Sequence, residues 1–180
     1  SSGCKESEVF ELLETIKPVR GRMELAATRR NGASVYVDYA HTPEAIEVAL
    51  KSLKPHILGK LIVIIGAGGE RDEGKRPLMG LAAEKNSDFV IITDDNPRNE
   101  DPQLIHQMIK NGIKDKNKVM VIGDRAEAIL KAVDLLGVGD CLLIAGKGHE
   151  TEQFIGENIF PFDDFEQASL SVSSLDGIER

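Results

Sequence analysis

The sequence of 180 residues predicts an α/β fold: a Rossmann-like, doubly wound, mostly parallel sheet with helices on both faces. Two observations predict it. Short apolar runs rich in β-branched residues alternate with longer segments that carry helical start signals. Most of these runs are apolar on both faces, which is typical of parallel strands covered by helices on either side. Crossovers between such strands are right-handed, and ligands bind beyond the carboxyl ends of the strands.

The expected strands are five short runs: Ser34–Val37, Leu61–Ile65, Phe89–Thr93, Val119–Ile122 and Cys141–Ala145. Helical start signals stand between them. Thr42-Pro43 places a capping hydroxyl before a proline at the first helical position, and Asp101-Pro102 repeats the pattern. Asp124 is expected to cap a third helix, which Gly137 ends. Strand and helix therefore alternate along most of the chain, as a doubly wound sheet requires.

The domain itself is expected over residues 19–180, which is enough chain for one well-packed core. Residues 1–18 carry a short amphipathic helical pattern that stops at Pro18. We interpret this segment as the tail of a preceding domain or as a linker. The residues Pro18 to Gly21 then form a candidate hinge between the two parts.

Composition excludes several classes of protein. The net charge of −8 argues against a protein that binds nucleic acid through a basic face. Cys4 and Cys141 have no metal-binding or redox spacing, which favours a reduced, cytoplasmic protein. The longest apolar run, Leu61–Ile65, is too short to cross a bilayer, and no signal peptide is visible. We therefore expect no nucleic-acid partner, no membrane partner and no metal site.

Four loops that follow expected strands carry the candidate functional residues. The first runs from Asp38 to Pro43. An aspartate between a strand and a capped helix can hydrogen-bond ribose hydroxyls or hold a neighbouring cation. Taken alone, this loop is better explained by an aspartate in a turn followed by a helix cap.

The second loop, Gly66–Pro77, is rich in glycine and in cationic residues. Glycines after a strand let backbone amides face an anion. Arg71 occupies the third glycine position of the dinucleotide fingerprint and so argues against it, and the run is not a Walker loop. Arg71, Lys75 and Arg76 suit a carboxylate or a phosphate, although solvated charges in a flexible loop are the alternative.

The third and fourth loops add charges of both signs. Asp94–Arg98 combines two acids, an amide, a proline and an arginine, which suits a ligand with both ammonium and carboxylate groups. Gly146–Glu150 allows close approach and offers a carboxylate to an ammonium group. His149 has no carboxylate or thiol at a sequence spacing that indicates a catalytic pair, and it is interpreted as structural or solvent-facing. A zwitterion with more than one carboxylate fits these loops better than a nucleotide alone.

Five ordered motifs also resemble a known family: Gly21-Arg22-Met23-Glu24, Asp38-Tyr39-Ala40-His41-Thr42-Pro43, the Gly69–Pro77 run, Asp95-Asn96-Pro97-Arg98 and Gly146-Lys147-Gly148-His149-Glu150. From about Pro18 onward the chain resembles the C-terminal domain of the Mur ligases. The resemblance implies a monomeric, three-domain cytoplasmic enzyme of peptidoglycan synthesis. Such an enzyme uses ATP and Mg²⁺, bound mainly by a central domain, and adds an amino acid to a UDP-linked muramoyl peptide through an acyl phosphate.

The resemblance also implies roles for single residues. Arg22 and Asp38 would face ATP when the domains close, near the phosphates and the ribose respectively. The motif at residues 95–98 matches the type that binds meso-diaminopimelate. The expected contacts to that amino acid come from Arg71, Asp95, Asn96, Pro97, Arg98, the carbonyl of Gly146 and Glu150. Arg71 would bind one carboxylate, Asn96 and Arg98 the second, and Gly146 with Glu150 the distal ammonium.

No catalytic residue is expected in this chain, because it lacks a phosphate loop and a UDP-sugar domain. The other domains would bind the UDP-N-acetylmuramoyl dipeptide, and this chain alone is expected to be inactive. Two alternatives stay open: a lysine-adding ligase of the same family, and a non-catalytic domain that binds an amino acid or a nucleotide. A nicotinamide dehydrogenase is a third possibility, and Arg71 argues against it.

Overall fold

The computed structural model describes residues 19–177, and the two expectations for residues 1–18, the amphipathic helix and Cys4, lie outside them. The strands are β1 (Glu24–Thr28), β2 (Ser34–Asp38), β3 (Leu61–Ile65), β4 (Phe89–Ile92), β5 (Val119–Val121), β6 (Cys141–Ala145), β7 (Glu152–Ile155) and β8 (Asn158–Pro161). The helices are α2 (Pro43–Leu53), α3 (Lys75–Asn86), α4 (Pro102–Asn111), α5 (Arg125–Asp134) and α6 (Asp164–Asp176), with 3-10 turns at Lys54–His56 and Lys116–Lys118.

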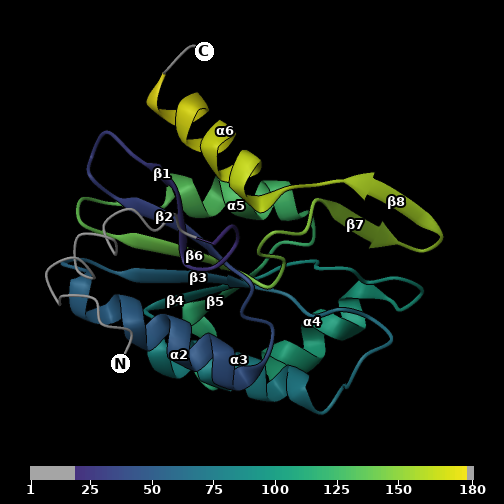
Figure 1. Cartoon of the computed structure of the whole chain (residues 1–180). Helices are drawn as coiled ribbons and strands as arrows, with labels where there is room; N and C mark the ends of the chain where they lie inside the picture. Colours follow the sequence, from purple (N-terminus) through teal and green to yellow (C-terminus); the bar gives the residue numbers. More distant parts are fainter. Residues whose placement is uncertain (1–18, 178–180) are drawn as a thin grey trace, which may run out of the picture.

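The main sheet has six strands in the order β1-β2-β6-β3-β4-β5. The five expected strands are all present and parallel, and their ends differ from the expected ones by at most one residue. Helices α2, α3 and α4 cover one face of the sheet, and α5 and α6 cover the other (Figure 1). A separate hydrophobic core lies on each face. The expectation of a doubly wound, mostly parallel sheet is confirmed.

The expected helix caps are confirmed. The Thr42 hydroxyl accepts a hydrogen bond from the Ala45 amide at 3.2 Å, and Asp101 and Asp124 likewise accept amides in the first turns of α4 and α5. The end of α5 was expected at Gly137 and lies at Asp134. Leu136 is nevertheless buried, so the apolar pattern continued past the helix and misplaced its end.

Four elements, β1, β7, β8 and α6, were not expected from the sequence. β1 pairs antiparallel with β2 at the edge of the sheet, and β7 and β8 form a separate hairpin whose turn contains Gly156. α6 is capped by Asp163, whose carboxylate accepts the Phe165 amide at 2.9 Å, and it packs on α5 and β1. Arg29 donates to Asp176 at 2.7 Å and so ties the end of α6 to the β1–β2 turn.

The order of the strands places the candidate site. The chain passes from β2 through β3 and β4 to β5, and α5 then returns it to β6, between β2 and β3. The direction of winding reverses there, and doubly wound sheets bind ligands at such a switch point, beyond the carboxyl ends of the strands. The four loops selected from the sequence follow β2, β3, β4 and β6, so they meet at this edge.

Two other features of the fold concern membrane insertion and the reactivity of the buried cysteine. No helix within residues 19–177 is both long enough and apolar enough to span a bilayer. Cys141 lies inside β6, where burial and the nearby charge of Asp140 raise the pKa of its thiol to about 12. A thiol that stays protonated at neutral pH is a poor nucleophile, and Cys141 acts as a small apolar side chain of the core.

Candidate functional site

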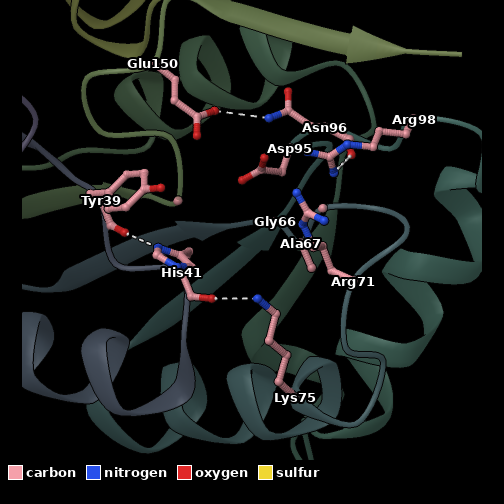
Figure 2. A pocket seen from close by; sticks show the side chains of 12 residues that line it. Tyr39, His41, Gly66, Ala67, Arg71, Lys75, Asp95, Asn96, Arg98 and Glu150 are labelled. Atoms are coloured by element: carbon pink, nitrogen blue, oxygen red, sulfur yellow. Dashed lines mark hydrogen bonds between the residues drawn. The ribbon is translucent and has the colours of Figure 1, made fainter. Parts of the chain in front are cut away.

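The four loops enclose a pocket of about 220 Å³ at the switch point (Figure 2). Its lining combines glycines at the strand ends with charged side chains of both signs. The lining residues are Tyr39, His41, Gly66, Ala67, Gly68, Arg71, Lys75, Asp95, Asn96, Arg98, Gly146 and Glu150. Six of the seven residues expected to contact an amino acid are therefore brought together. Pro97, the seventh, is buried beside the pocket and does not line it.

The cationic part of the pocket is built around Gly68. A Cβ added there would lie 3.0 Å from Arg98 Nη1, a tight contact, and 3.6 Å from Arg71 Cγ, an ordinary one, so both arginines lie close to the main chain at Gly68. Arg98 Nη1 donates to the Gly69 carbonyl at 2.8 Å. The main chain of Arg98 has a positive φ of 52° and is held by the hairpin, where its amide donates to the Phe154 carbonyl at 3.0 Å. The half-buried guanidinium of Arg98 is thus fixed before any ligand binds.

The acidic part of the pocket comes from Asp95 and Glu150. The buried side chain of Asn96, the residue next to Asp95, contacts Glu150: its Nδ2 donates a hydrogen bond to Glu150 Oε2 at 3.1 Å. Gln153 of β7 donates to the Asp95 carbonyl at 2.9 Å and fixes the main chain beneath that carboxylate. Figure 2 shows Arg71 and Arg98 on one side of the pocket and Glu150 on the other, with Asp95 between them. Opposite charges are therefore separated across the pocket.

Position 146 requires glycine for two reasons: the positive φ angle of its main chain and the closeness of the Asp95 carboxylate. Its φ is 118°, and an added Cβ would lie 2.7 Å from Asp95 Oδ2. We expect Gly146→Ala to lower the free energy of unfolding by about 2–4 kcal/mol, through backbone strain and displacement of Asp95. Gly156→Ala is the matched control, because its φ is also positive, at 58°, but nothing lies within 4 Å of the added Cβ. Urea denaturation that finds equal losses for the two variants would contradict the steric argument.

Arg76 was expected to contribute to anion binding, and the structure contradicts this. Its side chain is fully buried, and Nη2 lies 2.8 Å from Glu100 Oε2 and 3.3 Å from the Gly68 carbonyl. The guanidinium therefore supports the glycine-rich loop from behind and cannot reach the pocket. The sequence pattern failed here because Arg76 lies in the first turn of α3, on the face that turns toward the core.

Arg22 and Asp38, which were expected to face ATP, lie outside the pocket lining. The exposed Arg22 guanidinium stacks over the Tyr39 ring, 4.5 Å from its centroid. The two Asp38 oxygens accept the amides of Met23 and Ala40 at 2.7 and 2.8 Å, so Asp38 supports its own loop. Each carboxylate oxygen can accept a second hydrogen bond, which leaves Asp38 able to receive a ribose hydroxyl. The exposed cation and this carboxylate fit a nucleotide.

No cluster of three or more metal-ligating side chains occurs among residues 19–177. Two of the nearby carboxylates already accept hydrogen bonds, Asp38 from two backbone amides and Glu150, at Oε2 alone, from Asn96 and Lys147. The described residues alone therefore do not fit a resident divalent cation. They offer only single carboxylates to an ion held elsewhere.

Lys75, which was expected to suit an anion, lines the pocket, and so do Tyr39 and His41, which were not selected from the sequence as ligand contacts. Lys75 Nζ donates to the His41 carbonyl at 3.2 Å, which links the first loop to the start of α3. The Tyr39 ring packs against His41, with centroids 4.6 Å apart, and against His149, at 5.4 Å. The position of Tyr39 and His41 directly after β2 is the feature of the sequence that could have identified them as pocket residues. His149 is exposed, as expected.

The entry of the chain into the domain rests on the fourth loop. Gly21 has a φ of 68°, and a Cβ added there would lie 2.2 Å from the His149 amide nitrogen and 2.3 Å from the Gly148 carbonyl carbon. Arg20 forms an ion pair with Asp163, the residue that caps α6. The segment that leads into β1 is thus in direct contact with the loop that carries Glu150.

A buried ion pair supports the pocket from behind. Arg125 and Asp164 are both fully buried and form two hydrogen bonds of 2.7 Å. The same guanidinium donates to the carbonyls of Asp94 and Ala145, each at 3.1 Å, at the ends of β4 and β6. Burial alone would lower the pKa of Arg125, but the charge and hydrogen bonds of Asp164 outweigh it and raise that pKa. Arg125 therefore stays charged and fixes both strand ends.

These features define a class of protein: a doubly wound α/β domain with a pocket at its switch point that is lined by charged side chains of both signs. Residues 21–148 match the family described as "Mur ligase, glutamate ligase domain". The chain belongs to this Mur ligase family.

Relatives and solved structures agree with this assignment. The chain is 47% identical over 173 residues to a UDP-N-acetylmuramoyl-L-alanyl-D-glutamate–2,6-diaminopimelate ligase of Bradyrhizobium diazoefficiens, covering 96% of this chain and 35% of the relative. It is 50% identical over 160 residues to the ligase of the same name from Coxiella burnetii, covering 89% and 32%. A solved structure of a ligase of that name has a TM-score of 0.82 at 37% identity, covering 97% of this chain and 36% of that one. The chain thus spans about a third of the length of these relatives.

Proposed function

We propose that the chain is the amino-acid-binding domain of an ATP-dependent ligase of peptidoglycan synthesis. The ligase would add meso-diaminopimelate to UDP-N-acetylmuramoyl-L-alanyl-D-glutamate. ATP would phosphorylate the terminal carboxylate of the dipeptide, and an amino group of diaminopimelate would attack the acyl phosphate and release phosphate. The names of the related ligases support this substrate pair. The remaining two thirds of such a ligase, in a cytoplasmic and monomeric enzyme, would hold the UDP-sugar and most of ATP.

The observation that carries the proposal is the separation of charge across the pocket. Arg71 and Arg98 meet around Gly68, while Glu150 lies on the opposite side. Diaminopimelate carries two carboxylates and two amino groups, so each guanidinium would pair with one carboxylate, and Glu150 with the Gly146 carbonyl would receive the distal ammonium. Asn96 Nδ2 has one hydrogen left after its bond to Glu150 and would donate it to the carboxylate at Arg98. Lysine lacks the distal carboxylate and would leave Arg98 without a partner.

The chain's contribution to ATP binding would come from Arg22 and Asp38. The exposed Arg22 guanidinium would approach the phosphates, and Asp38 would accept a ribose hydroxyl. Magnesium, when bound with ATP, would offset the charge of the phosphates, and ligands outside residues 19–177 would supply most of its coordination. Residues 1–18 would belong to the preceding domain or to a linker.

The proposal is tested on the full-length polypeptide that carries this chain. Purified protein is incubated with ATP, Mg²⁺ and the UDP-muramoyl dipeptide, and incorporation of meso-diaminopimelate is compared with that of L-lysine. A strong preference for diaminopimelate is the expected result. A preference for lysine would establish the lysine-adding alternative instead. Calorimetric binding of an amino acid without any turnover would support a non-catalytic binding domain.

Residues 1–180 alone are expected to release no phosphate above the background without enzyme, because they contain no phosphate loop. The measurement is a phosphate-release assay with ATP, Mg²⁺, the dipeptide and diaminopimelate, with the full-length protein as the positive control. Turnover by the isolated chain would show that the catalytic groups lie within it.

A further inference from the structure

Lys147 is a fully buried cation that the proposed contacts to the substrate leave unused. It lies between Gly146 and Gly148, whose φ angles of 118° and 55° turn the main chain sharply on both sides. Its ammonium group donates to Asn96 Oδ1 at 3.0 Å and to Glu150 Oε2 at 3.3 Å. A buried ammonium is destabilising by several kcal/mol unless it is paired and hydrogen-bonded. Both of its partners line the pocket.

The orientation of the Asn96 amide follows from Lys147. Asn96 Oδ1 accepts from Lys147 Nζ and from the Phe154 amide, at 3.0 and 3.1 Å. In the flipped orientation the Asn96 NH₂ group would face two other donors and lose both hydrogen bonds. The amide is therefore held with Nδ2 toward the pocket and toward Glu150.

The orientation of the Glu150 carboxylate follows from the same network. Its Oε2 accepts from both Asn96 Nδ2 and Lys147 Nζ, at 3.1 and 3.3 Å. Among residues 19–177 no hydrogen bond to its Oε1 is formed, and its side chain is 35% exposed. One oxygen of Glu150 is thus committed to the protein, and the other is available to a ligand.

We propose that Lys147 is a positioning residue for amino-acid selection. It orients the Asn96 amide toward a ligand carboxylate and presents one oxygen of Glu150 to a ligand ammonium group. This inference rests on the proposed function. Lys147 does not itself contact the amino acid or a phosphate, because its side chain is fully buried.

The test uses Lys147→Met in the full-length polypeptide, since methionine retains the length of the side chain and removes its charge. Hydrogen bonds to charged groups contribute about 1.5–3 kcal/mol, so the KM for diaminopimelate is expected to rise about 10- to 100-fold. The KM values for ATP and for the dipeptide are expected to stay unchanged. Lys85→Met is the matched control, because Lys85 is exposed in the last turn of α3, and all its constants should equal those of the wild type.

A double-mutant cycle separates positioning from simple structural support. If Lys147 acts through Asn96, then Lys147→Met should raise the KM for diaminopimelate much less in an Asn96→Ala background than in the wild type. If the two effects multiply in full, Lys147 does not act through Asn96, and the inference is overturned. An equal rise in the KM for all three substrates would also overturn it, because general loosening of the domain would have that effect.

Two further outcomes have defined meanings. If Lys147→Met does not fold, Lys147→Gln is used, which keeps a donor for Asn96 without the charge, and its KM for diaminopimelate should rise about 2- to 10-fold. An unchanged KM in that variant would overturn the inference. If the wild type does not use diaminopimelate at all, the proposed function fails first, and the failure is visible before any variant is compared.

Discussion

Replacing Arg98 with alanine is expected to lower kcat/KM for diaminopimelate about 30- to 5,000-fold, the largest effect among the pocket variants. The guanidinium is half-buried and held by the Gly69 carbonyl, so it is positioned before a ligand arrives. Removing one partner of a buried charged hydrogen bond costs about 2–5 kcal/mol, which corresponds to that loss of rate. Steady-state kinetics of the full-length polypeptide with diaminopimelate and with L-lysine measure the effect.

The lysine reaction makes this prediction specific. Lysine has no carboxylate to pair with Arg98, so kcat/KM for lysine should change little or rise, and the preference for diaminopimelate should disappear. Arg98→Lys retains the charge but not the two-pronged geometry and should lie between the wild type and the alanine variant. Arg30→Ala, at an exposed position near the end of α6, is the control for loss of an arginine. Equal losses with both amino acids would assign Arg98 to folding of the loop and not to selection.

Replacing Asp164 with alanine is expected to lower the free energy of unfolding by about 3–5 kcal/mol. Asp164 is the only charged partner of Arg125 within hydrogen-bonding distance among the described residues, and both side chains are fully buried. Without it the guanidinium would stay buried and unpaired beneath the ends of β4 and β6. Urea denaturation of the chain, followed by circular dichroism, measures the change.

Two further variants show whether the loss of stability in Asp164→Ala comes from the unpaired charge of Arg125. Asp134→Ala removes an exposed carboxylate that pairs with Lys131 and should cost less than about 1 kcal/mol. Arg125→Met combined with Asp164→Leu removes both charges, so it should recover part of the stability. It should not recover all, because the carbonyls of Asp94 and Ala145 lose their donor. A double variant no more stable than Asp164→Ala would place the cost in packing and not in the unpaired charge.

The sequence predicted the parallel sheet because its strands are buried on both faces. Runs such as Leu61–Ile65 and Cys141–Ala145 are apolar throughout, and a hydroxyl or carboxylate caps each helix that was predicted. β1, the β7–β8 hairpin and α6 lack such apolar runs, although Asp163 caps α6. β8 is exposed along its whole length, and α6 is rich in serine, so neither carries a strong apolar period. Their positions depend on tertiary contacts that a local pattern does not contain.

The candidate site was predicted in part. The topology alone brings the ends of β2, β3, β4 and β6 together, so residues such as Arg71 and Glu150 could be grouped from the sequence. What could not be predicted was the direction of each side chain. Arg76 and Lys147 turn inward, whereas Arg71 and Lys75 turn toward the pocket, and all four belong to similar glycine-rich segments. Only the folded backbone, with its positive φ angles at Gly146 and Gly148, decides between these directions.

The contact between Gly21 and the fourth loop couples two properties of the molecule. Gly21 lies against Gly148 and His149, two residues from Glu150, and leaves no room for even one methyl group. A ligand that orders this loop therefore also favours one path of the main chain at residues 20–22. The coupling free energy between these two events is reciprocal. A contact that fixes the main chain at residues 20–22 must therefore raise the affinity for the ligand by the same factor by which the ligand favours that conformation. The affinity for a ligand that orders this loop and the direction in which the polypeptide enters the domain form one thermodynamic cycle.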